Sequence, residues 1–348
     1  MSEARFEQLK AALRFDDPLR RDGDDRLAPV RMVVEHYNSV MKSIYRPTEN
    51  LTVDEMLIEF HGRVAFRQYI PTKPGKFGVK LFWIAESPSA IPLQTLVYVG
   101  EQTVSRAEKE EHGGHVPALL MRLMEPYMNK GRNVTGDNYF SDLSTAVKLA
   151  NKKTTYVGTL RSNKRCLPDE AKSITNRSRG DSLHFYSDQA TICSYWDKGQ
   201  RPVNILSTMH GPQRNMSSDD GKPEIVNFYN QTKSGVDTLD KIIRGYSSKR
   251  KYRRWPVHVF FTLVDCSVYV AFQLFKQQEL EHVTMHALCI SKRPCLSNAY
   301  QSRITKILIP SKIEDDCEKC HGASWNLAPD SIAAAACTCS TRKVFFVS

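Results

Sequence analysis

Four acidic residues stand where carboxylates could act together. The run GVKLFWIAES carries an apolar, β-branched stretch that stops at Glu86, and the short run NVTGD stops at Asp137. The motif GVDTLD places Asp237 and Asp240 three residues apart, on one face of a helix. Because α/β proteins place their chemistry at the carboxyl ends of strands, these four acids form a candidate site.

The chemistry that such acids support is metal-dependent phosphoryl transfer. Two divalent ions about 3.5–4 Å apart stabilise the entering and the leaving oxygen of an in-line displacement. Hard oxygen ligands favour Mg²⁺ or Mn²⁺. The spacing alone leaves a chance arrangement open, because the chain contains 38 Asp and Glu residues.

The segments around these acids predict the sheet that must position them. The runs AFRQYI, GVKLFWIA and LQTLVYVG are aromatic and β-branched, and Pro/Gly-bearing segments separate them, as in strands joined by hairpins. NVTGD then reads as a strand, SDLSTAVKLANK as a helix capped by Ser141 or Asp142, and TTYVGTL as another strand. A strand, a helix and a strand in that order imply a parallel pair, and hence a mixed sheet with helices against it.

The remaining segments differ in pattern. Residues 4–15 and 30–45 have helical periodicity and precede the strands. Between residues 161 and 229 the runs SLHFYSDQATICSYW and PVNILSTMHG suggest a few strands with polar loops and no strong helix. Helical character returns around Gly235. These features predict a β-rich insertion before a final helical segment.

Composition and charge favour an anionic partner, nucleic acid first. The chain has 348 residues and 49 Lys and Arg against 38 Asp and Glu, which gives a net charge of +11. The first ten residues lack the apolar segment of a secretory signal, so we expect the nine cysteines to be reduced thiols. The apolar run at 257–275 contains His258, Asp265 and Gln273, which favours a buried core helix over a membrane span.

Four segments resemble the core of piggyBac-type DNA transposases. They are LTVDEMLIEFHGRVAFRQYIPTKPGKFGVKLFWIAES, NVTGDNYFS, VGTLRSNKR and YNQTKSGVDTLDK, and the resemblance extends in order to about Phe275. It implies an α/β, ribonuclease-H-like DDE/D fold, a mixed sheet with flanking helices and a β-rich insertion. It also implies cut-and-paste chemistry at TTAA sites with three aspartates and two metal ions.

By this resemblance the second aspartate is Asp137 and the third is Asp237, with Asp240 as an additional acid. The first falls on Glu86, where the family has Asp. One added methylene moves a carboxylate by more than an ångström, and errors of that size cost on the order of 10²-fold in rate. The resemblance therefore predicts a metal site with Mg²⁺ or Mn²⁺ whose strand cleavage is impaired.

Basic residues near the acids and in the run SSKRKYRRWP are candidates for DNA contact. Cations neutralise phosphates, and an aromatic ring can stack on an unpaired base. A solvated surface and a nuclear-import signal are the alternatives for the run. The candidate DNA-binding residues are Lys73, Lys76, Arg161, Lys164, Arg165, Lys249, Arg250, Lys251, Arg253, Arg254 and Trp255.

The cysteines near the end of the chain are candidate zinc ligands. Cys317 and Cys320 form a C-x₂-C half-site, and the later C-x-C pair, Cys337 and Cys339, has poor spacing for the other half. The family has a cysteine-rich zinc domain at this end and a long segment before its catalytic region. The sequence therefore suggests a domesticated or decayed copy of a transposase, or an incomplete gene model. Free thiols are the alternative to a zinc site at these cysteines.

These observations predict five segments. They are a helical lead-in (1–50), the first part of the catalytic core (51–160), the β-rich insertion (161–230), the C-terminal core helices (231–288) and an irregular cysteine-rich tail (289–348). The expected function is that of a nuclear, DNA-binding relic of a transposase, and a homodimer is compatible with it. An active Mg²⁺-dependent transposase or nuclease and a domesticated protein-interaction scaffold are the alternatives.

Overall fold

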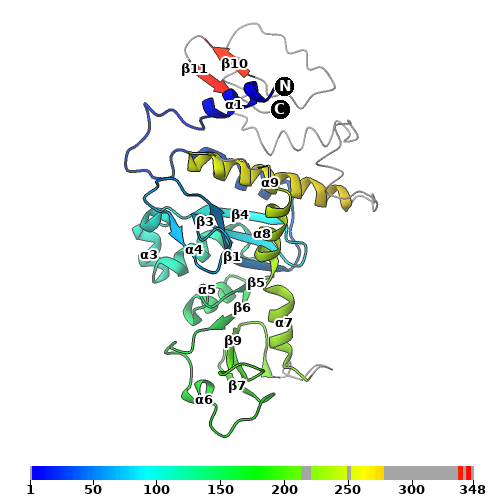
Figure 1. Ribbon diagram of the computed structural model, residues 1–348. Coiled ribbons are helices and arrows are strands. Elements are labelled where there is room, and N and C mark those ends of the chain that lie inside the picture. Colours follow the sequence, from blue (N-terminus) through cyan, green and yellow to red (C-terminus); the bar gives the residue numbers. More distant parts are fainter. Residues whose placement is uncertain (1, 213–220, 249–251, 278–335, 340–341, 346–348) are drawn as a thin grey trace. The chain divides into compact units, whose positions relative to one another are not determined.

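The computed structural model describes residues 2–212, 221–248, 252–277, 336–339 and 342–345 (Figure 1). The chain divides into two compact units. One comprises residues 45–57 and 80–241, and the other comprises residues 1–44, 58–79 and 242–348. All four predicted acids belong to the first of these units.

A mixed sheet forms the framework of the structure, as the sequence predicts. Over the described residues it has nine strands in the order β2-β3-β1-β5-β6-β9-β8-β7, with β4 paired to β3. The strands are β1 (Asn50–Glu59), β2 (Gln68–Tyr69), β3 (Phe77–Glu86), β4 (Pro92–Val97), β5 (Arg132–Gly136), β6 (Thr154–Leu160), β7 (Ser182–Tyr186), β8 (Thr191–Tyr195) and β9 (Val203–Ser207). A separate antiparallel pair joins β10 (Ala336–Cys339) to β11 (Arg342–Phe345).

Strand direction in the centre of the sheet follows from the connections. β5 and β6 are joined through the helix α5 (Leu143–Asn151) and pair in parallel, and β5 also pairs in parallel with β1. β3 runs antiparallel to β1. The start of β1 meets the end of β3, where the N–H of Ser87, just after β3, donates to the carbonyl of Asn50 (2.9 Å). The carboxyl end of β3 therefore lies at the amino ends of β1 and β5.

The predicted insertion extends the same sheet. β9 pairs antiparallel with β6, and β8 and β7 follow in turn. The segment also contains two helices that the polar pattern did not suggest, α6 (Asp169–Lys172) and α7 (Glu224–Thr232), each with a proline at its N-cap. α7 packs on β8 and β9 (Figure 1), where its residues Ile225 and Val226 join a buried cluster with Cys193 and Ile205.

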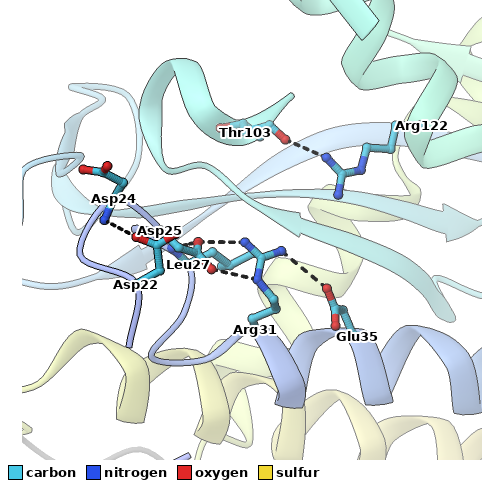
Figure 2. A network of polar contacts seen from close by, with 8 residues as sticks. All are labelled: Asp22, Asp24, Asp25, Leu27, Arg31, Glu35, Thr103 and Arg122. Atoms are coloured by element: carbon cyan, nitrogen blue, oxygen red, sulfur yellow. Dashed lines mark hydrogen bonds and ion pairs between the residues drawn. The ribbon is translucent and has the colours of Figure 1, made fainter. Parts of the chain in front are cut away.

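Two other helices of this unit begin at side-chain caps. α3 (Arg106–His112) has a capping box between Ser105 and Glu108, and α5 begins with Asp142 accepting from the N–H of Thr145, which selects Asp142 over Ser141. The remaining elements are η1 (Gly100–Thr103), α4 (His115–Met124), η2 (Glu125–Tyr127) and α8 (Gly235–Gly245). Arg122 of α4 donates to the carbonyl of Thr103 (3.0 Å; Figure 2).

The second unit contains α1 (Glu3–Ala12), α2 (Arg31–Ile44) and α9 (Trp255–Lys276), and α2 packs on α9. Hydrogen bonds and ion pairs between charged residues hold the loop before α2. The guanidinium of Arg31 donates twice to Asp25 (2.7 and 2.9 Å) and also to Glu35, while Asp22 accepts from the N–H of Asp24 (Figure 2). This arginine lowers the pKa of Asp25 and ties the loop to the first turn of α2.

α9 is, among the described helices, the one long and apolar enough to cross a membrane by length and composition. Its most apolar window is 61% buried in the structure, as in a core helix. Asp265 within it is buried and accepts from Ser247 and from the N–H of Ser248 (3.0 and 2.9 Å). The polar residue inside the apolar run is therefore hydrogen-bonded within its own unit.

Candidate active site

The parallel pairing of β1 with β5 brings two aspartates together. The register ends with Val53 opposite Gly136. The next residue along each chain is an aspartate, Asp54 on β1 and Asp137 directly after β5. Continuing the register by one residue sets the two carboxylates beside each other at the carboxyl edge of β5.

A helix junction is fixed to the same two strands. The hydroxyl of Thr52 donates to the carbonyl of Thr232, the last residue of α7 (2.6 Å), and Thr135 of β5 contacts the hydroxyl of Thr232 (2.8 Å). Gly235 opens α8, and a Cβ there would lie 2.8 Å from Oγ1 of Thr52, so only a glycine allows this close approach. Asp237, in the first turn of α8, is thereby held near β1.

The strand pattern shows which face carries the acids. Side chains two residues apart on a strand share a face, so Asp54 lies on the same face of β1 as Thr52. Asp137 follows Thr135 by two residues in the same way. The threonines that anchor the α7–α8 junction and the aspartates therefore mark one side of the sheet.

Burial and the neighbouring acids both act on the carboxyl of Asp54. Burial raises the pKa of Asp54 to about 7, and the nearby charges of Glu55, Asp137 and Asp237 raise it as well. Its carboxylate accepts a hydrogen bond from the N–H of Glu55 (2.7 Å), which opposes this shift. A carboxyl that titrates near neutral pH among other acids is a feature of functional sites.

Asp137 is held by the turn that follows it. Burial raises its pKa, and Asp237 raises it further. The N–H groups of Tyr139 (2.9 Å to Oδ1) and Phe140, and the guanidinium of Arg161, lower it. These backbone donors hold the carboxylate of Asp137 in the turn after β5.

The donor set suits hard divalent cations in its chemistry. Asp54, Asp137 and Asp237 supply carboxylate oxygens, and a cation among them would relieve the repulsion that raises the pKa of Asp54. Within the described residues, no group of three or more His, Cys, Asp or Glu side chains is gathered closely enough to hold a metal ion. Asp237 is exposed and Asp240, one turn further along α8, is buried, so a role for Asp240 stays a prediction.

Glu86 is placed differently from the other predicted acids. It is buried, and its Oε2 accepts from the hydroxyl of Tyr45 (2.8 Å) and from Oγ of Ser89. Its Oε1 accepts from the N–H of Thr48 (2.6 Å). Both oxygens are therefore used to hold the segment that leads into β1.

The prediction that Glu86 shares a site with Asp137 is wrong on this geometry. The charge of Glu86 acts on Arg132, the first residue of β5, whereas Asp137 follows the last. Asp137 lies five residues beyond Arg132, and five residues of extended chain span about 16 Å. Glu86 and Asp137 therefore lie near opposite ends of β5. The sequence reasoning placed the end of β3 at the carboxyl edge of the sheet, but β3 runs antiparallel to β1 and ends at the opposite edge.

Comparison with known proteins identifies the family of the chain. A family described as Transposase IS4 matches residues 1–272. A piggyBac transposase, solved as a synaptic complex with hairpin DNA, superposes with a TM-score of 0.74 and 29% identity, over 89% of this chain and 68% of that one. The chain belongs to the piggyBac-type transposases. The ribonuclease-H-like α/β fold expected from the resemblance is confirmed by this match.

Two human members of this family are similar in sequence. PiggyBac transposable element-derived protein 2 is 24% identical over 300 residues, which is 78% of this chain and 48% of that protein. PiggyBac transposable element-derived protein 3 is 21% identical over 280 residues, or 76% and 47%. The chain thus spans about half the length of these curated relatives.

Arg254 of this transposase-family chain was predicted to bind DNA, but the structure uses it elsewhere. Its guanidinium donates to the carbonyls of Leu13 (2.6 Å), Lys10 (3.0 Å) and Ala11 (3.2 Å), at the end of α1. Arginine at these positions satisfies carbonyls that a helix leaves open. Arg254 therefore links the end of α1 to the start of α9, and its predicted phosphate contact stays a prediction.

The aromatic residues of the same run also pack inside their unit. Trp255 meets the ring of Phe66 edge-on (5.1 Å), and Tyr252 stacks on Phe261 (4.9 Å). Both residues are half-buried, and the predicted stacking of Trp255 on a DNA base stays a prediction. Arg253 is exposed, and its predicted DNA contact stays a prediction.

Basic residues next to the acids include one close neighbour of Asp137. Arg161, after β6, is exposed, and its Nε donates to Asn138 (2.8 Å) while its charge lowers the pKa of Asp137. Lys164 lies 3.5 Å from Asp142, and Arg165 is exposed. Of the predicted basic residues in this unit, Arg161 is the one that the structure brings to the acid site.

The other predicted residues belong to the second unit or lie outside the described residues. Lys73 and Lys76 lie between β2 and β3, in the second unit. The predicted residues outside the described part of the chain are Lys249, Arg250 and Lys251 for DNA contact, and Cys317 and Cys320 for zinc.

The sequence reasoning missed Asp54. It lies inside the strand NLTVDEMLIE, not at its end, so a search for acids at strand ends passes over it. A signal was nevertheless present, since a charged pair in the middle of an apolar strand costs free energy unless it has a function.

Proposed function

We propose that this chain is the catalytic core of a piggyBac-type protein that binds DNA and cleaves its strands with divalent cations, using Asp54, Asp137 and Asp237. The observation that carries the proposal is the β1–β5 register, which sets Asp54 beside Asp137 with α8 fastened to the same strands. Because Glu86 lies outside this cluster, the reason for expecting an impaired site is removed.

Each residue has a defined task in this proposal. Asp54 is held on a central strand, Asp137 is fixed by the N–H of Tyr139, and Asp237 is carried by the first turn of α8. Mg²⁺ or Mn²⁺ bound there would stabilise the entering and leaving oxygens of the cleaved phosphate. Asp54, with a pKa of about 7, would release its proton when the cation binds, so cation affinity should rise with pH.

Three observations support DNA as the partner. The net charge is +11, and Arg161 exposes its guanidinium next to Asp137. The similar piggyBac transposase was solved in a complex with hairpin DNA. Action in the nucleus and the choice between Mg²⁺ and Mn²⁺ are parts of the same proposal.

The proposal is tested by nicking of an end-labelled duplex that contains TTAA. We expect nicking with Mg²⁺ or Mn²⁺, and a loss of at least about 10²-fold in Asp137→Asn. DNA affinity should be kept in the variant, because the substitution removes a negative charge. Binding should weaken as salt rises, since cations released from phosphates drive it.

Each of the other possible outcomes would contradict one part of the proposed function. Salt-dependent binding without nicking by the unmodified protein would leave a DNA-binding relic in place of an enzyme. DNA affinity that does not change with salt concentration, or no DNA binding at low salt, would favour a protein-interaction scaffold. Nicking that survives in Asp137→Asn would remove the acids from the chemistry.

A further inference from the structure

Lys80 of β3 has an unusual environment. Its ammonium lies over the rings of Phe82 (4.7 Å), Tyr98 (4.8 Å) and Tyr139 (5.3 Å). These residues come from β3, from the chain just after β4 and from the turn after β5. One cation therefore joins three segments of the unit that contains the acids.

Core filling alone does not explain a lysine at this position. Burial lowers the pKa of Lys80, while the negative charge of Glu55 raises it. An apolar side chain of similar length would fill the space without the cost of desolvating an ammonium. The charge is thus kept against a desolvation cost, and Glu55 and the three ring faces are what it acts on.

The rings lead directly to Asp137. Tyr139 stacks on Phe82 (centroids 6.1 Å apart, planes at 10°) and meets Phe140 edge-on (5.1 Å). The backbone N–H of Tyr139 donates to Oδ1 of Asp137 (2.9 Å). A force that fixes the Tyr139 ring therefore also fixes the donor that orients this carboxylate.

We propose that Lys80 is a positioning residue for the acid site: its ammonium holds the ring of Tyr139 and thereby keeps the Asp137 carboxylate in place. The effect on cleavage rests on the proposed function, but the effect on the turn at residues 137–141 does not. Lys80 itself takes no part in the reaction and touches no substrate.

The first test is hydrogen exchange of the metal-free protein. In Lys80→Met, which keeps the stem and removes the charge, amides of residues 137–141 should exchange about 10-fold faster than in the unmodified protein. Lys80→Arg keeps a cation over the rings and should restore slow exchange. Exchange in β5 and β6 should be unchanged, and Lys172→Met, at an exposed lysine, should behave like the unmodified protein.

The second test is the concentration of Mn²⁺ that gives half-maximal nicking. We expect it to rise about 10-fold in Lys80→Met, with recovery in Lys80→Arg and unchanged DNA affinity, as when a residue supporting a ligand is lost. If the unmodified protein does not nick, the proposed function fails, while the exchange result still decides the role of Lys80.

Three exchange results would overturn the proposal. Unchanged exchange at residues 137–141 in Lys80→Met would show that the charge does not hold the turn. Faster exchange throughout the sheet would show that Lys80 serves the fold as a whole. Failure of Lys80→Arg to restore slow exchange would show that the cation is not what acts on Tyr139.

Discussion

Replacement of Asp54 by asparagine is expected to stabilise the metal-free protein at pH 8 by a few kcal/mol and to leave its stability near pH 4 unchanged. The pKa of Asp54 is about 7 in the folded protein, against 3.8 as its ordinary value. A pKa raised by folding gives stability that is present at low pH and is lost as the pH rises toward 7. One pKa unit corresponds to about 1.4 kcal/mol, so about 4 kcal/mol is the upper limit.

The measurement is chemical denaturation between pH 4 and 8, with Asp169→Asn as the control. Asp169 is exposed, and Lys172 lowers its pKa, so removing its charge should bring no gain as the pH rises. If Asp54→Asn and the unmodified protein had parallel pH profiles, folding would not raise the pKa of Asp54, and the description of a carboxyl buried beside other acids would be wrong.

Gly158→Ala is expected to disturb the fold and the acid site together. A Cβ at Gly158 would lie 2.5 Å from Oγ of Ser141, 2.6 Å from the hydroxyl of Tyr156 and 2.7 Å from the carbonyl oxygen of Gly136. The carbonyl cannot move alone, because Gly136 is paired with Gly158 across β5 and β6. Overpacking of this kind costs about 1–3 kcal/mol.

The same change reaches Asp137 through Ser141. The hydroxyl of Ser141 donates to the carbonyl of Asp137 (2.9 Å) and contacts the hydroxyl of Tyr156 (2.8 Å). We expect nicking to fall by about 10²-fold, since errors of an ångström in placement cost that much. Gly211→Ala is the control, because a Cβ there meets nothing within 4 Å. Full activity of Gly158→Ala at unchanged stability would contradict this description of the turn.

The elements that depend on local pattern could be predicted from the sequence. The strand, helix and strand around Asp137 appear as β5, α5 and β6, and GVDTLD opens α8 with Asp237 in its first turn. Their parallel pairing follows from the connecting helix. Local periodicity and capping therefore sufficed for two of the three acids of the proposed site.

What depended on strand direction could not be predicted in the same way. Glu86 ends a strand, but its edge of the sheet is set by the antiparallel course of β3, which the acid at its end does not reveal. Asp54 became visible only when the β1–β5 register placed it beside Asp137.

Partners that are distant in the sequence could not be predicted either. Arg254 has the sequence context of a phosphate contact, yet its guanidinium donates to carbonyls at the end of α1, more than 200 residues earlier, and no local pattern shows such a partner.

The most direct test of the acid site compares Asp54→Asn with Glu86→Gln in their response to Mn²⁺. The measurement is the shift in melting temperature at pH 8 with increasing Mn²⁺, which reports binding to the folded state even if no DNA is cut. We predict an upward shift for the unmodified protein, the same shift from a lower starting temperature for Glu86→Gln, and no shift for Asp54→Asn. A shift that Asp54→Asn keeps and folded Glu86→Gln loses would contradict the placement of Asp54, and not Glu86, in the site.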